Sequence, residues 1–442
     1  MGDRQYLPEV KDQYENYPYP PRDPEQERER LIDGIIDHAA LVNHYCFGGK
    51  QSFENARVLI AGGGTGDATM FWAEQLRDKN AEVVHVDISE ASIQIAQQRA
   101  AIRELENITW HQQSLLDLSS KELGYFDFVN CHGVLHHLAD PTAGLRSLHA
   151  LLRDNGGMGL LLYGRYGRLA LYQVQELLQR FGIQQLDIGK RVELARRLME
   201  QLPASSWYKR SSHKDAHVAL SDAVFFDSYL HSQDRAYTVS ELYDFIATCE
   251  FHFVEFCNPA QRVFYRPETY LKEKQLLQLL PKDQQQRQAA AELLGGHIDR
   301  HEFYISRQPD TVASLDDLEN VPFFFPLPMD GVSAVIAAAS DGKAVDIDRQ
   351  NGLRARFKPR QHTEAIFKFL DGMRTLAQIF AQVRQQPNSS QVTDEELLAD
   401  FRPIYNVLNR LDVLLLRHQS VNAFPTGSEL HARTVRISPR IA

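Results

Sequence analysis

The stretch that most constrains the fold of this chain is Val58–Asp67, an apolar run that breaks into glycines and then opens a helix. A short continuous run of apolar, mostly β-branched residues is typical of a buried parallel strand. The glycines that follow, Gly62-Gly63-Gly64-Thr65-Gly66, let the backbone approach a ligand where a Cβ would clash. A second apolar run, Val83–Val86, ends in Asp87, about 20 residues on, where nucleotide-binding folds of this type hold the ribose hydroxyls. Together the two features predict a nucleoside-binding strand, turn and helix.

The order of elements around this turn predicts an α/β fold with a parallel sheet. Strands are predicted, in chain order, over Arg57–Ala61, Glu82–Asp87, Ile108–Gln112, Phe126–Cys131 and Gly157–Leu162. Helical periodicity lies between them, as over Glu90–Arg103. Such alternation gives a sheet with helices on both faces, and the ligand then lies beyond the carboxyl ends of the strands.

The glycine pattern also helps to choose between ligands. A dinucleotide site needs a further glycine on the helix, and counted from Gly62 that position is Asp67. The turn instead has the Gly-x-Gly-x-Gly form, and here the chain resembles the class I S-adenosylmethionine-dependent methyltransferases, a resemblance that is strong over Arg57–Arg168. It implies a bacterial enzyme with a Rossmann-like seven-stranded methyltransferase sheet and S-adenosylmethionine as cofactor.

The same resemblance predicts how the sheet is completed and where it is interrupted. A Thr-x-x-Glu capping box at Thr238 opens a helix, the sixth strand follows at Phe251–Phe256, and His301–Ser306 suits the antiparallel seventh strand. The methyltransferase domain is therefore predicted over residues 51–308, with helical insertions at 166–236 and 267–294 on the substrate side.

A smaller domain is predicted at the C-terminus. Residues 309–328 are acidic and punctuated by proline, which suits a linker, and residues 329–442 follow it. Their predicted elements are strands at Ser333–Ala338 and Leu353–Phe357, helices at Thr363–Leu370, Thr375–Val383 and Asp394–Leu411, and a strand at Val413–Leu416. This order resembles the winged-helix peptide-binding domain of pyrroloquinoline quinone biosynthesis, so we expect a small winged-helix-like α+β domain.

The N-terminal arm, residues 1–50, contains an aromatic and proline run and then a predicted charged helix over Glu25–Val42. Its tyrosines, Tyr17 and Tyr19 among them, either pack the arm onto the core or form a lid over the cofactor or substrate. We treat these two tyrosines as substrate-side candidates.

The resemblance assigns cofactor contacts along the first four strands. The glycine turn would admit the methionine and ribose, and Asp87 would accept both ribose hydroxyls. Ser114 occupies a place that is often acidic in the family, so the Ser114 hydroxyl and the Leu115 backbone, more than Asp117, are expected to hold adenine. The full predicted set is Ala61, Gly62, Gly63, Gly64, Gly66, Asp87, Ile88, Ser114, Leu115, His132 and Gly133.

Two histidines are candidates for a catalytic base. The segment Val134–Pro141 closely resembles the family's Val-Leu-His-His-Leu-x-Asp-Pro stretch. His136 or His137 could take a proton from the nucleophile, or pack instead. Methyl transfer from a sulfonium needs alignment, desolvation and deprotonation of the acceptor, and we predict no metal site.

Acceptor-binding groups are expected after the fifth strand. In the loop Tyr163–Arg168, aromatic and basic residues alternate with glycine. Tyr163 and Tyr166 could hold an amine or the sulfonium by cation–π attraction, while Arg165 and Arg168 could clamp a carboxylate; the alternative is a solvated loop. His231, in the first insertion, is either a substrate contact or part of a buried hydrogen-bond network.

Composition excludes some partners. The net charge of −10 over 442 residues argues against a nucleic-acid substrate. The four cysteines have no Cys-x-x-Cys spacing, which fits a reducing, cytoplasmic compartment without zinc, and no apolar run is long enough for a membrane span. We expect a cytoplasmic protein.

The sequence leaves three functional hypotheses. The first is methyl transfer to an N or O nucleophile, on a protein or peptide that the extra domains recognise. The second is a small-molecule methyltransferase for a metabolite or natural product, with the tail forming a homodimer. The third is a non-catalytic, cofactor-binding regulatory protein, which activity on any acceptor would rule out.

Overall fold

The centre of the molecule is a mostly parallel sheet with the strand order β3-β2-β1-β4-β5-β8-β7, in which a short β6 also pairs with β5. The computed structural model describes residues 8–325, 345–348, 354–387, 389–426, 429–430 and 433. The strands are β1 Arg57–Ala61, β2 Glu82–Asp87, β3 Ile108–Gln112, β4 Phe126–His132, β5 Leu152–Gly164, β6 Ala236–Tyr237, β7 His252–Phe256 and β8 Arg300–Ser306. Because β8 runs antiparallel to both β5 and β7, the predicted methyltransferase-type sheet is confirmed.

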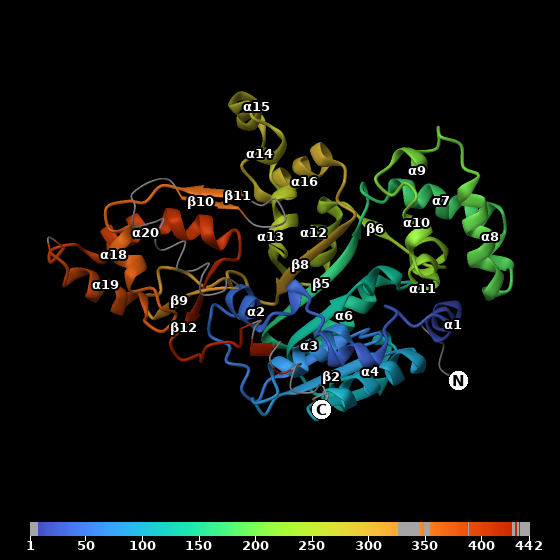
Figure 1. Ribbon diagram of the computed structural model, residues 1–442, viewed down its shortest axis with the longest axis horizontal. Helices are drawn as coiled ribbons and strands as arrows, with labels where there is room; N and C mark the ends of the chain where they lie inside the picture. Colours follow the sequence, from blue (N-terminus) through green and yellow to red (C-terminus); the bar gives the residue numbers. More distant parts are fainter. Residues whose placement is uncertain are drawn as a thin grey trace, which may run out of the picture.

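Alternating side chains of each central strand enter two separate cores. On β1, Leu59 and Ala61 pack with α6 Pro141–Leu151 and α12 Val239–Thr248, whereas Val58 and Ile60 face α2 Ala39–Cys46 and α3 Asp67–Gln75. The period of two along a strand places helices on both faces of the sheet, as Figure 1 shows. The ligand edge stays free at the carboxyl ends of the strands.

Two helical segments extend from the domain where insertions were predicted. The first contains α7 Leu169–Arg180, α8 Ile188–Glu200, α9 Trp207–Arg210, α10 Ala216–Ala219, α11 Asp222–Phe225 and a single π-helical turn, η6 Phe226–Leu230. It has its own apolar core and lies to the right in Figure 1. The second contains α14 Pro267–Tyr270, α15 Lys274–Leu279 and α16 Gln284–Gly295 and lies at the top.

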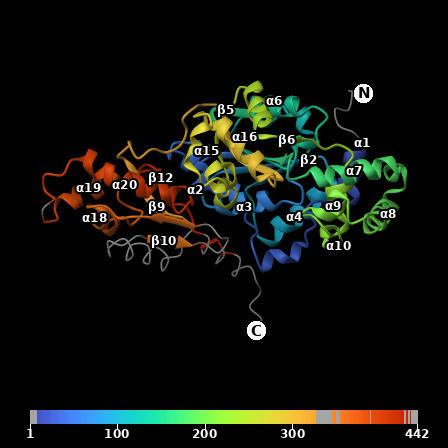
Figure 2. The same cartoon turned by 90° about the horizontal axis from the view of Figure 1, so that it is seen from above.

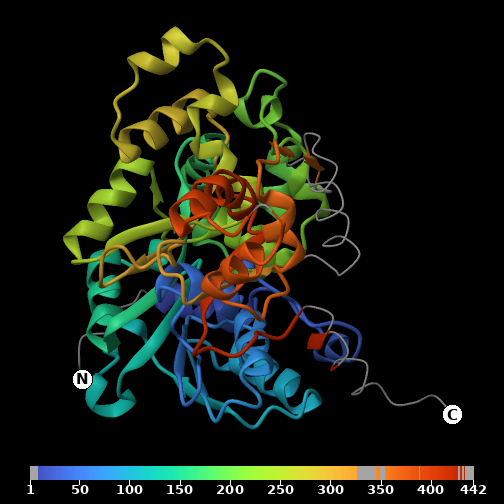
Figure 3. The same ribbon diagram turned by 90° about the vertical axis from the view of Figure 1, so that its left-hand side faces the viewer.

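The C-terminal part lies on the opposite side of the sheet from the first insertion, as Figures 1 and 2 show. It contains α18 Thr363–Lys368, α19 Leu376–Arg384 and α20 Asp394–Asn409, with strand pairs β9 Asn320–Phe324 to β12 Leu414–His418 and β10 Val345–Asp348 to β11 Arg354–Phe357. Figure 3 views this part face on. The strand predicted at Ser333–Ala338 lies outside the described residues, and the winged-helix assignment stays a prediction.

One boundary differs from the prediction. Residues 309–328 were expected to form a linker, but Asn320–Phe324 within them is strand β9 of the C-terminal sheet. Proline marked this segment as irregular, yet Pro322 is tolerated because β9 has β12 as its only strand neighbour among the described residues.

The helix predicted over Glu25–Val42 is wrong. The arm instead consists of α1 Pro8–Asn16, short 3₁₀ turns η1 Pro24–Arg28 and η2 Ile35–Asp37, and then α2. Glu27, within the segment predicted as a charged helix, is buried, and it pairs with Arg99 and Arg103 at the end of α4 Glu90–Ile102. These long-range ion pairs outweigh the local helical pattern. None of the helices in the described part of the chain is both long and apolar enough to cross a bilayer.

Candidate functional site

A cavity of about 480 Å³ opens at the carboxyl ends of β1, β2, β4 and β5. Its walls come from the glycine turn, the loop after β4, the arm and the first insertion. The predicted cofactor residues that line it are Gly62, Gly63, Gly64, Asp87, Ile88, Ser114, Leu115, His132 and Gly133. The other two predicted cofactor residues do not line the cavity: Ala61 is buried in the core, and Gly66 caps the start of α3.

The glycine turn is held against β2 and Asp87. The Gly62 and Gly63 amides donate to the Val86 carbonyl at 2.8 and 3.0 Å, and the Gly64 amide donates to Asp87 Oδ2 at 2.8 Å. The Ser89 amide donates to Asp87 Oδ1 at 2.9 Å, while burial raises the pKa of this carboxyl. Backbone donors thus orient Asp87, which still faces the cavity.

Two glycines show where space is needed. Gly64 has φ +52°, and a Cβ there would lie 2.3 Å from the Tyr19 carbonyl oxygen, so the arm sits directly on the turn. Gly133 has φ +79°, and a Cβ there would meet nothing within 4 Å. The open space at Gly133, facing an oriented Asp87, fits the S-adenosylmethionine that the sequence predicts.

The arm both packs on the domain and forms a cavity wall. The Thr65 amide and hydroxyl donate to the carbonyls of Tyr19 and Pro20 at 3.2 and 2.6 Å, and Arg22 pairs with Asp67 at 2.5 Å. Tyr14 and Tyr19 line the cavity. The two interpretations of the arm are therefore compatible, because the segment that packs is also the segment that covers the site.

Asp227 of η6 is the centre of a hydrogen-bond network at the inner end of the cavity. It is 3% exposed, and it accepts hydrogen bonds from the hydroxyls of Tyr14 at 3.1 Å and Tyr163 at 3.3 Å. Burial raises the pKa of Asp227, and it raises the pKa of both tyrosines well above their usual range. The tyrosines are therefore neutral donors, and the carboxylate is their acceptor.

The proton positions of the neighbouring histidines follow from their partners. His231 Nδ1 accepts from the Gln233 amide at 3.1 Å, so the proton of the neutral ring is on Nε2, which lies 3.3 Å from the Tyr14 hydroxyl. His137 Nδ1 lies 2.8 Å from the Gln233 carbonyl and must donate to it. In neutral His137, Nε2 then accepts from His136 Nε2 at 3.1 Å.

These hydrogen bonds bear on whether His136 or His137 has a nitrogen free to act as the predicted catalytic base. His137 lines the cavity, but His136 already occupies its acceptor nitrogen. His136 is fully buried and stacks on the Tyr163 ring with 3.8 Å between ring centroids, while burial lowers its pKa well below the usual value. His136 therefore has a packing position, and His137 reaches the cavity without a free acceptor nitrogen.

Of the residues in the loop after β5, one lines the cavity and the others lie outside its lining. Tyr163 lines the cavity, and Arg168 lies over its ring at 3.5 Å and pairs with Asp234 at 3.5 Å. Arg165 does not line the cavity, and its guanidinium contacts Glu241 at 2.8 Å and the Ala236 carbonyl, so its role as a carboxylate clamp stays a prediction. Tyr166 is half-buried outside the cavity lining.

Two other substrate candidates also lie behind the wall. Tyr17 stacks on Phe226 of η6 with 5.2 Å between ring centroids, and His231 stacks on His137 at 3.7 Å. Of the two predictions for His231, the structure favours the buried network. On the acceptor side, the cavity wall therefore includes Tyr14, Tyr19, Tyr163, His137 and Asp227.

Sequence reasoning missed several lining residues. Asp227 and Gln233 carry no local motif, and Tyr14 was considered only as one of the tyrosines of the arm. Glu302 was predicted only as a strand position, and its partner Arg300, at 3.0 Å, lies just before the predicted strand. The alternation of His301–Ser306 already indicated that one face of β8 is polar at its start. It did not indicate which site that face borders.

His137, Asp227 and His231 bring three potential metal-ligand atoms within 4.8 Å of one another. The hydrogen bonds of both rings use nitrogens that a metal would need: His137 Nε2 accepts from His136, and the neutral His231 ring has its proton on Nε2. A metal ion would have to displace these bonds, so the arrangement suits a hydrogen-bond network.

Comparison with known proteins agrees with this site. A family described as a methyltransferase domain matches residues 59–158. An uncharacterized protein of Synechococcus sp. is 31% identical over 307 residues, which are 67% of this chain and 70% of that one. The ubiquinone biosynthesis O-methyltransferase of Acinetobacter baylyi is 27% identical over 100 residues, and the match spans only 40% of that enzyme.

The fold is shared with a solved structure over most of its length. PKMT2 from Rickettsia typhi, solved in complex with AdoHcy, superposes with a TM-score of 0.58 at 15% identity, over 87% of this chain and 76% of that one. At this identity the likeness concerns the fold. It extends well beyond the 100 residues of the methyltransferase match.

Proposed function

Since this chain belongs to the class I S-adenosylmethionine-dependent methyltransferase family and uses S-adenosylmethionine as cofactor, we propose that it methylates an amine nitrogen, namely a lysine side chain of a protein or peptide. The cofactor supplies an electrophilic methyl group on a sulfonium. The glycine turn, Asp87, Ser114 and Leu115 would hold it. The similarity to a methyltransferase domain and to named methyltransferases supports an enzyme over the non-catalytic hypothesis.

The position of Asp227 in the cavity is the observation that favours a nitrogen acceptor over an oxygen acceptor. During transfer, positive charge moves from sulfur to the acceptor atom, so an amine becomes an ammonium whereas a phenolate becomes a neutral ether. A buried carboxylate stabilises the first change and repels a phenolate. Within the described part of the chain, Asp227 receives two tyrosine hydroxyls and no ion pair, so its charge is available to a cationic substrate.

Asp227 also suits the proton chemistry. An alkyl amine arrives as an ammonium and must lose one proton before its lone pair can attack. Asp227 attracts the ammonium, and the proton leaves to solvent before attack, so Asp227 is still ionised when positive charge forms on the nitrogen. The tyrosine hydroxyls of Tyr14 and Tyr163 hold the carboxylate in place.

The depth of Asp227 supports a lysine. Asp227 is 3% exposed, lines the cavity and is contacted by the Tyr14 and Tyr163 hydroxyls, so an unbranched apolar stem with a terminal ammonium suits the approach to it. A small-molecule acceptor is the second candidate, because the matching ubiquinone biosynthesis O-methyltransferase has a name that indicates a small-molecule pathway and an oxygen acceptor.

The test uses S-adenosylmethionine with a labelled methyl group and a lysate from cells that lack this protein. We expect label in the protein fraction, released by acid hydrolysis as methylated lysine. Label confined to small molecules would contradict the protein substrate, and label in an oxygen ester or ether would contradict the nitrogen acceptor.

Asp227→Asn tests the role of the carboxylate in the same assay. We expect turnover to fall by about 100-fold or more, because a charge that stabilises the transition state is lost, while the affinity for S-adenosylhomocysteine stays within about twofold. Asp222→Asn, an exposed position on α11, is the matched control. Equal rates for both variants would contradict the role of Asp227.

A further inference from the structure

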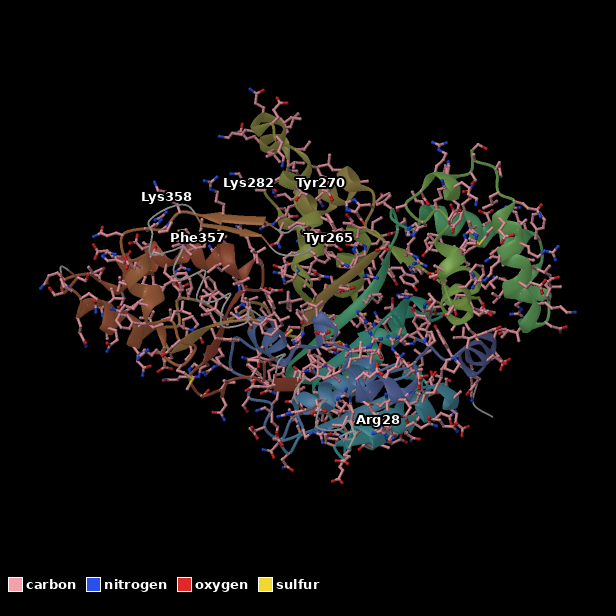
Figure 4. All side chains as sticks on the ribbon, in the orientation of Figure 1. Arg28, Tyr265, Tyr270, Lys282, Phe357 and Lys358 are labelled. Atoms are coloured by element: carbon pink, nitrogen blue, oxygen red, sulfur yellow. The ribbon has the colours of Figure 1, made fainter. Side chains whose placement is uncertain are left out.

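A second pocket, of about 200 Å³, lies between the segment that follows β7 and the C-terminal part of the chain. Four arginines and three apolar residues line it, and the arginines are Arg262, Arg266, Arg356 and Arg410. Arg262 ends the short helix α13 Pro259–Arg262, and Arg266 follows the turn η7 Val263–Tyr265. Arg356 lies on strand β11, and Arg410 follows the last residue of α20. Figure 4 labels Tyr265 and Phe357, the chain neighbours of Arg266 and Arg356.

Arg262 builds the pocket. It is buried, its Nη1 pairs with Asp412 at 3.1 Å, and its Nε donates to the Phe256 carbonyl at 2.8 Å. Its Nη1 also donates to the Arg410 carbonyl at 3.3 Å. Asp412 thus neutralises the charge of Arg262, and the hydrogen bond from Arg262 to the Arg410 carbonyl holds the backbone at Arg410 in place.

Arg266 and Arg410 carry charge that the surroundings do not neutralise. Within the described residues, neither guanidinium forms an ion pair. Burial and the charge of Arg410 lower the pKa of Arg266, against the weaker opposite effects of Glu255 and Glu268. Glu255 lies 3.8 Å from Arg262, and Glu268 pairs with Arg287. The pocket therefore gathers unpaired positive charge in a chain whose net charge is −10.

We propose that this pocket binds a phosphate group, either as the free ion or as a phosphate monoester of a small molecule. Guanidinium groups donate in planar pairs that match the oxygens of a phosphate, and the charges of Arg266 and Arg410, from two elements, favour a dianion over a monoanionic carboxylate. The ligand would bridge the segment after β7 and α20. The proposal is independent of the proposed methyl-acceptor chemistry.

The test titrates the full-length protein with inorganic phosphate by calorimetry at constant ionic strength, with glycerol phosphate and acetate as parallel ligands. We expect saturable binding of phosphate or its monoester and at least about tenfold weaker binding of acetate. Tighter binding of glycerol phosphate than of inorganic phosphate identifies the monoester as the ligand, and the reverse identifies the free ion.

Arg410→Met and Arg266→Met should each weaken phosphate binding by about tenfold, because each removes charge-assisted hydrogen bonds. Arg410 is exposed, so its replacement leaves the fold intact, and thermal unfolding without phosphate checks both variants. Arg210→Met, at an exposed position of α9 in the first insertion, is the control that removes one charge elsewhere. The proposal is overturned if phosphate heats are not saturable, if acetate binds as tightly, or if all three variants bind phosphate as the wild type does.

Discussion

At the scale of single residues, the site depends on two buried carboxylates with different surroundings. Asp87 is held by backbone amides from the glycine turn and from the start of α4, which suits a fixed acceptor for neutral hydroxyls. Asp227 is held by two tyrosine hydroxyls, which leaves it a buried anion that suits a cation. The donor set of each carboxylate thus indicates the charge of the ligand group beside it.

Asp87→Ala should weaken the binding of S-adenosylhomocysteine by about 30-fold or more, because two charge-assisted hydrogen bonds to the ribose would be lost. Calorimetry on the full chain measures this change, and circular dichroism checks the fold. Asp117→Ala, at an exposed position after β3, should leave the affinity unchanged. Equal affinities of the Asp87 and Asp117 variants would refute the assignment of Asp87.

At the scale of elements, the arm completes a site that the sheet only begins. The segment from α1 to η1 covers the glycine turn through backbone hydrogen bonds to Thr65 and the Arg22–Asp67 ion pair, and it contributes Tyr14 and Tyr19 to the cavity wall. A ligand in the cavity lies beneath this segment. Release of the arm is therefore expected to accompany exchange of cofactor and product.

Arg22→Met should loosen the arm. The lost pair is bidentate and partly exposed, so we expect about 1 kcal/mol or less, equivalent to at most about fivefold faster hydrogen exchange over residues 8–22. Dissociation of S-adenosylhomocysteine should accelerate by a similar factor.

Arg28→Met is the control for that measurement, because Arg28, labelled in Figure 4, pairs with Glu25 on an exposed surface of the same arm. Identical exchange and dissociation rates in the two variants would mean that the Arg22–Asp67 pair does not hold the arm over the cavity.

At the scale of the whole molecule, His44 joins the central domain to the C-terminal sheet. It lies on α2, where Nε2 accepts from the Asn409 side-chain amide at 3.0 Å, so Nδ1 has the proton and donates to the Leu416 carbonyl of β12 at 3.2 Å. Burial lowers the pKa of His44 to about 4. The contact of His44 with the C-terminal sheet therefore requires a neutral imidazole.

The pH dependence follows from this shift. Between pH 6.5 and about 4 the unfolded chain binds a proton at His44 that the folded chain does not, so the free energy of unfolding falls as the pH falls through this window. His44→Gln should lower the free energy of unfolding at pH 7.5 and show a shallower pH dependence from 6.5 to 4, measured by urea unfolding. A variant with the wild-type slope would contradict the role of His44.

The local sequence indicated the first five strands, the glycine turn and the position of Asp87 at the end of the second strand, because hydrophobic period and glycine placement act over a few residues and need no distant partner. The strands that complete the sheet came from the family resemblance, and the strand order is known only from the structure. The same reasoning failed for the Glu25–Val42 helix, where Glu27 has partners far away in sequence, Arg99 and Arg103. It also gave no sign of the Arg165–Glu241 ion pair, which likewise joins residues far apart in the chain.

Only the tertiary structure decided the acceptor side of the site. Tyr14 and Asp227 meet although 213 residues separate them, and Tyr163 reaches Asp227 across 64 residues. No periodicity records such a contact, because it depends on how the arm and the first insertion dock onto the sheet. The sequence by itself therefore determined the methyl-donor half of this protein, and the docking of two peripheral segments decided the half that selects the acceptor.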